Sequence, residues 1–140
     1  MSRGPSAALR WFVVGSLMVA LGACRPAASA ADVIHLRIVH SRFVPALFAV
    51  RAGSTVRIVV RNDDPIDHEL IVGDRATQDS HESGVEAHHD GSVPGEVSVA
   101  AGTQVTTTYP FGHAGPLLYG CHLPGHWAYG MRGSIRLRHP

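Results

Sequence analysis

Lysine is absent from this 140-residue chain, and cysteine occurs only twice. All 12 basic residues are therefore arginine, and they nearly balance the 11 acidic residues. Nucleic-acid-binding domains normally carry a strongly basic patch, which this composition does not supply. Hydrophobic residues make up 45% of the chain and charged residues 16%. This composition suits one globular domain of ordinary size with its own core.

Long apolar runs are also lacking. The run from Trp11 to Ala23 has 13 residues, whereas a membrane-spanning helix needs about 20. A short apolar run near arginines, here Arg3 and Arg10, is typical of a secretory signal peptide. The sequence therefore predicts export of the chain and not a membrane-spanning helix.

The end of this run resembles a bacterial lipoprotein box, because Leu21-Gly22-Ala23 leads directly to Cys24. We expect residues 1–23 to be a lipoprotein-type signal peptide, Cys24 to be lipidated, and residues 24–31 to form a small-residue tether. The alternative is an ordinary signal peptide that is cut near the alanines between 27 and 31. Residues 32–140 are expected to form the folded domain. Cleavage before Cys24 removes two arginines and leaves 10 against 11 acidic residues, a net charge of −1.

Cysteine is scarce enough to restrict the chemistry of the exported chain. Once Cys24 is assigned to the export signal, Cys121 is the one thiol left. A lone cysteine in an oxidising compartment has no disulfide partner within the chain. It is either an inert buried thiol, a common fate of free cysteine, or a metal ligand.

Apolar and polar residues alternate in short segments from residue 33 onward, with turn signals between them. No helical spacing of apolar residues stands out, and residues 74–95 are interpreted as a long polar loop. Pro45 interrupts an irregular edge strand at 42–50, because proline cannot donate to a central ladder. The pattern predicts an all-β sandwich or barrel of seven or eight strands. The other expected strands cover residues 33–38, 55–61, 68–72, 97–100, 104–111, 117–121 and 134–138.

One stretch places a thiol, an imidazole and a thioether at regular spacing, since Cys121, His126 and Met131 form a C-x4-H-x4-M motif. Two histidines and one cysteine in a trigonal plane, with a weak axial methionine, make a blue-copper electron-transfer site. The second histidine must come from upstream. His68 fits, because strand alternation places it on the inward face at a strand end, and His40 is its nearest competitor. Met131 could instead fill the core, which is the usual function of methionine.

The stretch from Val33 to Arg138 resembles the cupredoxins, the family of small blue-copper proteins, and its loop is similar to that of rusticyanin-like and auracyanin-like members. The features that carry the resemblance are Pro124-Gly125 before His126, Gly130 before Met131, the Phe43-Val44-Pro45 segment, the turn at 52–56, and Asn62 before His68. The resemblance implies a cupredoxin-like Greek-key β-sandwich or barrel and one copper per chain, cycling between Cu+ and Cu2+. The implied ligands are His68, Cys121, His126 and Met131. It also implies electron transfer through the partly exposed edge of His126, framed by an apolar patch of Leu123, Pro124, Trp127 and Ala128.

Three further features need an interpretation. Glu69 follows His68 where many family members have asparagine or serine; its backbone N–H could still reach the copper thiolate, while its carboxylate would favour the oxidised site. His122 follows Cys121, but residue 120 is glycine, so the His-Cys-His run of multicopper oxidases is absent and we expect a surface or loop residue. The polar loop contains His81, His88 and His89, for which a solvated loop is the ordinary interpretation and a second, labile metal site the alternative.

Together these observations predict an exported one-electron carrier with a type 1 copper site and no substrate chemistry of its own. Its partners would be redox proteins at the membrane face, such as a cytochrome or a terminal oxidase or reductase, and we expect a monomer. The alternative is a copper-handling protein, for resistance or delivery, that uses the same ligands. A small copper oxidase or reductase would need an open coordination position or a second metal.

Overall fold

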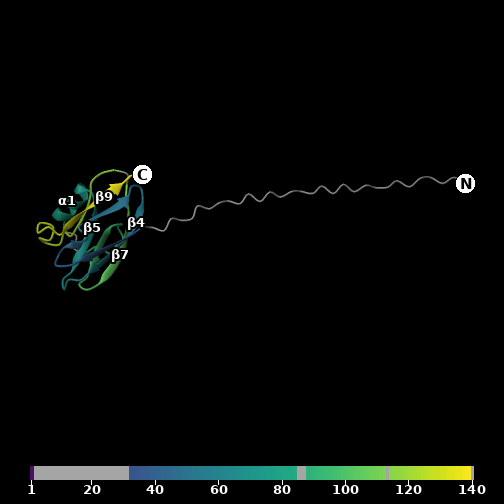
Figure 1. Ribbon diagram of the computed structural model, residues 1–140. Helices are drawn as coiled ribbons and strands as arrows, with labels where there is room; N and C mark the ends of the chain where they lie inside the picture. Colours follow the sequence, from purple (N-terminus) through teal and green to yellow (C-terminus); the bar gives the residue numbers. More distant parts are fainter. Residues whose placement is uncertain (2–31, 85–87, 113, 140) are drawn as a thin grey trace.

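The computed structural model describes residues 1, 32–84, 88–112 and 114–139, and from residue 32 onward these form a sandwich of two β-sheets (Figure 1). Residues 2–31 lie outside the described residues, so the predicted signal peptide, the lipidated Cys24 and the tether stay predictions. In the described part of the chain, no helix is both long and apolar enough to cross a membrane.

The strands are β1 (Val33–Ile38), β2 (Phe43–Val44), β3 (Leu47–Arg51), β4 (Thr55–Asn62), β5 (His68–Gly73), β6 (Glu96–Val99), β7 (Gln104–Pro110), β8 (Leu117–Gly120) and β9 (Arg132–Arg138). One sheet has the order β2-β1-β4-β7, in which only β1 and β4 are parallel neighbours. The other has the order β3-β9-β8-β5-β6, in which only β3 and β9 are parallel neighbours. The prediction of an all-β sandwich is confirmed.

Alternation along the strands builds the core between the sheets. In β4, Val56, Ile58 and Val60 are fully buried, while the arginines at 57 and 61 are exposed. Strand β5 differs, because all of its residues are buried. Its second face is covered by the helix α1 (Arg75–Ser83), which packs against β5 and β8. The strand that begins with His68 is therefore held from both sides.

Pro45 divides the expected edge strand into two pieces. The first, β2, pairs with β1 in one sheet, and the second, β3, pairs with β9 in the other. The chain thus crosses between the sheets from Val44 to Leu47, and each piece lies at the edge of its sheet. Pro45 itself lies between the two strands, so its missing N–H removes no ladder hydrogen bond. This split is why nine strands are found where seven or eight were predicted.

The interpretation of residues 74–95 as a loop is wrong for its first half, which contains helix α1. Asp74 caps the helix, since its carboxylate accepts a hydrogen bond from the N–H of Thr77 at 2.9 Å and so satisfies a free donor of the first turn. The buried side chain of the helix is the polar Gln78, so no apolar spacing could reveal it. The Gln78 amide donates to the carbonyl of Ile71 at 3.2 Å, which fixes α1 against β5.

Tyr119 of β8 lies in the middle of the core and is fully buried. Its ring contacts Phe43 and Phe48, with centroid separations of 5.3 and 5.2 Å. Aromatic pairs of this kind contribute about 0.5–1.5 kcal/mol beyond their burial. The Tyr119 hydroxyl donates to the carbonyl of Pro45 at 2.6 Å. These contacts tie β8 to the crossover segment, and thereby fix the position of Cys121, which follows β8 directly.

Candidate metal centre

The C-x4-H-x4-M motif forms a compact loop between β8 and β9. The N–H of Cys121 donates to the carbonyl of Met131 at 3.1 Å, and the N–H of Met131 donates to the carbonyl of His126 at 2.9 Å. Gly125 and Gly130 have φ angles of 84° and 89°, in the left-handed region that glycine adopts without strain. The loop therefore closes on itself and brings the three residues of the motif together.

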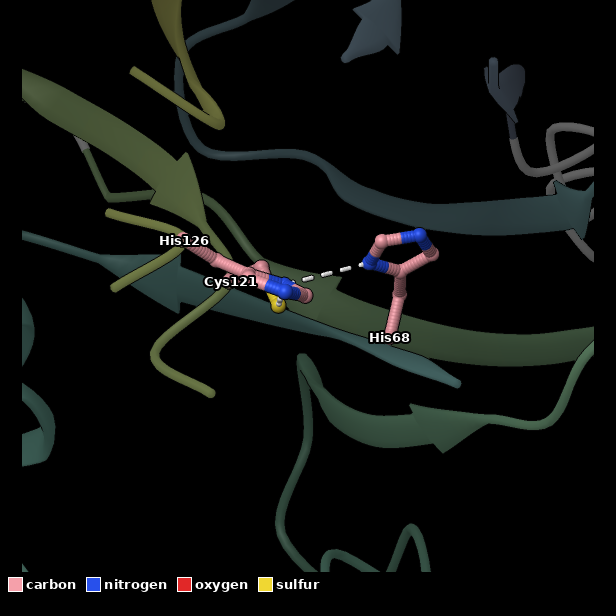
Figure 2. A group of neighbouring side chains, drawn as sticks. All are labelled: His68, Cys121 and His126. Atoms are coloured by element: carbon pink, nitrogen blue, oxygen red, sulfur yellow. Dashed lines mark hydrogen bonds between the residues drawn. The ribbon is translucent and has the colours of Figure 1, made fainter. Parts of the chain in front are cut away.

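His68 approaches this loop from the neighbouring strand. It is the first residue of β5, which pairs with β8 in a register that places Ile71 opposite Gly120. Counting back along antiparallel strands, His68 lies just beyond the end of β8, beside the loop. Figure 2 shows its ring directed toward Cys121 and His126. The sequence prediction that these three side chains meet agrees with this geometry.

The distances suit a single metal ion. The Nδ1 atoms of His68 and His126 are 3.3 Å apart, and the Sγ of Cys121 is 3.2 Å from Nδ1 of His126. All three ligand atoms lie within 4.8 Å of one another. Metal–nitrogen bonds near 2.0 Å and metal–sulfur bonds near 2.3 Å give ligand atoms about 3.5 Å apart in a trigonal plane. A thiolate with two imidazoles is a soft donor set that suits copper.

Asp64 orients His68, and it was not identified from the sequence. Its Oδ2 lies 3.0 Å from Nε2 of His68. A carboxylate can only accept, so Nε2 carries the hydrogen and Nδ1 presents its lone pair to the metal position. The carboxylate is held in turn by the backbone N–H groups of His40 and Ser41, each at 2.7 Å. The competitor His40 therefore contributes through its backbone, and its exposed side chain is no ligand here.

The signal for Asp64 was present but ambiguous. It lies four residues before His68 in an Asn-Asp-Asp-Pro segment that reads as a turn. Burial raises the pKa of the Asp64 carboxyl, but hydrogen bonds from Ser41, His40 and His68 outweigh it and lower that pKa overall. Asp64 is thus a buried carboxylate that stays ionised beside the imidazole it orients.

Burial also controls the charge of the ligands. It raises the pKa of the Cys121 thiol to about 11, against hydrogen bonds from the backbone N–H groups of Leu123 and Glu69, which lower it. Burial is likewise the main cause that lowers the pKa of His68. Without a metal, the site thus favours a protonated thiol and neutral imidazole, and a metal ion must displace the thiol proton on binding. The N–H of Glu69 donates to the Cys121 sulfur, as expected from the sequence. The same N–H can donate to the sulfur when it is a thiolate.

Met131 is fully buried, and its backbone is joined to Cys121 and His126 as described above. It therefore lies at the closing point of the ligand loop. Its function as the axial ligand stays a prediction, which rests on this position and on the C-x4-H-x4-M spacing.

Two expectations about the loop need correction. His122 lies in the loop, as expected, but its side chain is not at the surface, because it is only 2% exposed and its ring nitrogens lie 2.9 Å from Glu82 and 2.8 Å from Gln78. Trp127 does not belong to an exposed apolar patch. It is 8% exposed and stacks on His122 with a centroid separation of 4.7 Å. The sequence could not show that α1 covers this side of the loop. Around the partly exposed His126, the exposed residues of the loop are Pro124, Gly125, Ala128 and Tyr129.

The replacement Asp64→Asn should weaken copper binding by about 10- to 100-fold, the usual effect of losing the residue that orients a metal-bound histidine. Both carboxylate oxygens of Asp64 accept hydrogen bonds from N–H groups, and the NH2 group of asparagine cannot accept one. The hydrogen bond that fixes the tautomer of His68 is therefore lost or weakened. Competition with a copper chelator measures the change. Asp63→Asn is the matched control, since Asp63 pairs with the exposed Arg37 and Arg61 on the surface. Equal affinities of the two variants would contradict the assignment.

Comparison with known proteins agrees with the geometry. The family model described as copper binding proteins, plastocyanin/azurin family, matches residues 34–138. The chain is 37% identical over 119 residues to the copper-resistant cuproprotein CopI of Rubrivivax gelatinosus, covering 81% of this chain and 72% of that protein. It is 26% identical over 150 aligned positions to the protein of the same name from Pseudomonas aeruginosa, covering 85% and 83%.

The fold also matches a solved structure. Auracyanin A, a blue copper protein from Chloroflexus aurantiacus, superposes with a TM-score of 0.61 at 22% identity, over 78% of this chain and 100% of that chain. At this identity the likeness concerns the fold alone. The family match spans both sheets and the whole ligand loop, and the Cys-His-His set is a donor set that suits copper. The chain therefore belongs to the plastocyanin/azurin family of copper-binding proteins, the cupredoxins, and its cofactor is copper.

Proposed function

We propose that this chain is an exported copper-resistance protein that binds copper at a type 1 site and exchanges one electron there. The observation that carries the proposal is the arrangement of His68, Cys121 and His126, with ligand atoms within 4.8 Å of one another at the end of the β-sandwich. The relative named as a copper-resistant cuproprotein, which covers 81% of the chain, supports resistance as its biological purpose.

Some residues of the chain hold the metal ligands in place, and another, His126, connects the metal site to the surface. Bound copper supplies a one-electron centre that cycles between Cu+ and Cu2+. Asp64 and the backbone of Glu69 hold His68 and Cys121 in place before metal binds. Such preorganisation limits movement between the two oxidation states. His126 is partly exposed and so gives an electron a route to or from the surface.

A general one-electron carrier is the second candidate, and the exposed residues around His126 favour it. Pro124, Ala128 and Tyr129 are exposed there, with Tyr129 79% exposed. A small apolar surface over a redox centre suits brief docking of a partner, such as a cytochrome or a terminal oxidase or reductase. In both cases we propose a monomer at the outer face of the cell membrane, anchored through Cys24, with no substrate chemistry of its own.

Complementation separates the two candidates. The full chain should restore growth in copper to a Rubrivivax gelatinosus strain that lacks its own CopI. Asp64→Asn should restore it less well, because its site holds copper more weakly. His35→Ala, an exposed position on β1, serves as the control and should match the wild-type chain. Failure of the wild-type chain, although it accumulates and carries copper, would contradict resistance and leave electron carriage as the proposed function.

A further inference from the structure

A second group of metal-binding side chains lies on the outer side of the β5 sheet. His81 comes from α1, His89 from the segment that precedes β6, and Glu96 is the first residue of β6. One ligand atom from each lies within 4.8 Å of the other two. Their side chains are only 13%, 6% and 15% exposed, respectively. Of the three histidines considered from the sequence, His88 is exposed and does not belong to this group.

The distances within the group suit a shared ion better than direct hydrogen bonds. Nε2 of His81 and Nδ1 of His89 each lie 3.4 Å from Oε2 of Glu96. Good N–H···O hydrogen bonds are about 2.7–3.2 Å long. Ligand atoms about 2.0–2.1 Å from one metal ion are separated by about 2.8–3.4 Å, from right-angled tetragonal to tetrahedral geometry. The two histidine–glutamate distances therefore lie at the upper end of the spacing expected for ligands of one ion.

The other nitrogen of the His81 ring is occupied in the way that metal-binding histidines require. Nδ1 of His81 lies 2.9 Å from the carbonyl of Thr77. A carbonyl only accepts, so Nδ1 carries a hydrogen and Nε2 is the ring atom that faces Glu96. A metal ion bound between Nε2 and the carboxylate would be held by both. Metal-bound histidines almost always donate their second N–H to a carbonyl or a carboxylate.

His89 has a carboxylate behind it. Its Nε2 lies 3.7 Å from Oε2 of Glu69, beyond hydrogen-bonding distance but within the range of an ion pair, and the Glu69 side chain is 3% exposed. The other oxygen of Glu69 accepts a hydrogen bond from the N–H of His122 at 2.6 Å, which fixes the carboxylate in place. Because His122 follows Cys121 directly, the same Glu69 contacts the ligand loop of the type 1 site and the second group.

We propose that His81, His89 and Glu96 form a second metal site, which binds one Cu2+ ion in addition to the copper at Cys121. Imidazole and carboxylate ligands suit Cu2+, which also binds most tightly among the divalent first-row metals. Three protein ligands leave a coordination position open for water. The site is distinct from the type 1 centre and does not depend on the biological function proposed above.

The test is the copper stoichiometry of the full chain, purified without metal and titrated with Cu2+. The wild-type chain should bind two copper ions, with the blue band of the type 1 site and a second paramagnetic resonance signal typical of nitrogen and oxygen ligands. The double variant His81→Ala/His89→Ala should bind one and keep the blue band, which also shows that it is folded. His88→Ala should bind two.

Glu96→Gln provides an independent variant that keeps the shape of the side chain. It should lower the affinity of the second site at least tenfold and leave the blue band unchanged. A wild-type chain that binds one copper ion would overturn the proposal, as would a double variant that still binds two. Neither result depends on growth in copper, so failure here is distinguishable from failure of the proposed function.

Discussion

Replacing Cys121 with serine is expected to abolish the blue colour of the copper-loaded protein and its bleaching by ascorbate. The intense visible band of a type 1 site arises from charge transfer between a thiolate and copper, and serine offers no sulfur. A hydroxyl is also a harder donor that suits copper less well. The copper affinity of this site should therefore fall by more than the 10- to 100-fold loss that follows removal of an orienting residue. A visible spectrum of the full chain with Cu2+, before and after ascorbate, gives the result.

The same variant should fold normally without metal. Cys121 is fully buried, serine is close to it in size, and its hydroxyl oxygen can accept from the N–H groups of Leu123 and Glu69 that contact the thiol. The free energy of unfolding of the metal-free chain should change by no more than about 1 kcal/mol. An intense blue band in Cys121→Ser would contradict the ligand assignment. A colourless wild-type protein would exclude a type 1 site and favour simple copper storage.

The ligand loop could be predicted because its chemistry is local. Cys121 and His126 lie five residues apart, and Gly125 bends the chain between them. The spacing alone therefore predicts a loop that brings the two side chains together. His68 could be predicted from strand alternation, since the buried face and the strand end are both visible in the sequence. Two kinds of local pattern thus sufficed for the three side chains that meet.

Asp64 and Glu96 could not be predicted because their functions depend on tertiary contacts. Asp64 is surrounded by N–H groups from residues 40 and 41, more than 20 positions away. Glu96 meets His81 only because α1 packs on β5. This helix has no apolar stripe, so the spacing of apolar residues does not predict it. Its stability comes instead from a capping aspartate and from Gln78, which donates to the backbone of β5. Polar packing of this kind leaves no periodic signal in the sequence.

Gly120 packs so closely against Trp127 that no side chain fits at this position. Gly120→Ala is expected to destabilise the protein by about 1–3 kcal/mol, the usual cost of overpacking. A Cβ at this position would clash with Cζ3 and Cε3 of Trp127. The indole has little room to move, because His122 stacks on it and the guanidinium of Arg132 lies 5.2 Å from its ring centre. Chemical denaturation of the metal-free chain measures the loss.

The effect should reach the copper site, because Trp127 is the neighbour of His126 and the two share the ligand loop. Copper affinity should therefore fall together with stability. Gly112→Ala is the control: nothing lies within 4 Å of a Cβ there, so the stability should change by less than about 0.5 kcal/mol. In a Trp127→Leu background, Gly120→Ala should cost much less than in the wild-type chain, since the ring that it meets is gone. Equal costs in both backgrounds would show that the clash with Trp127 is not what requires glycine before the copper ligand.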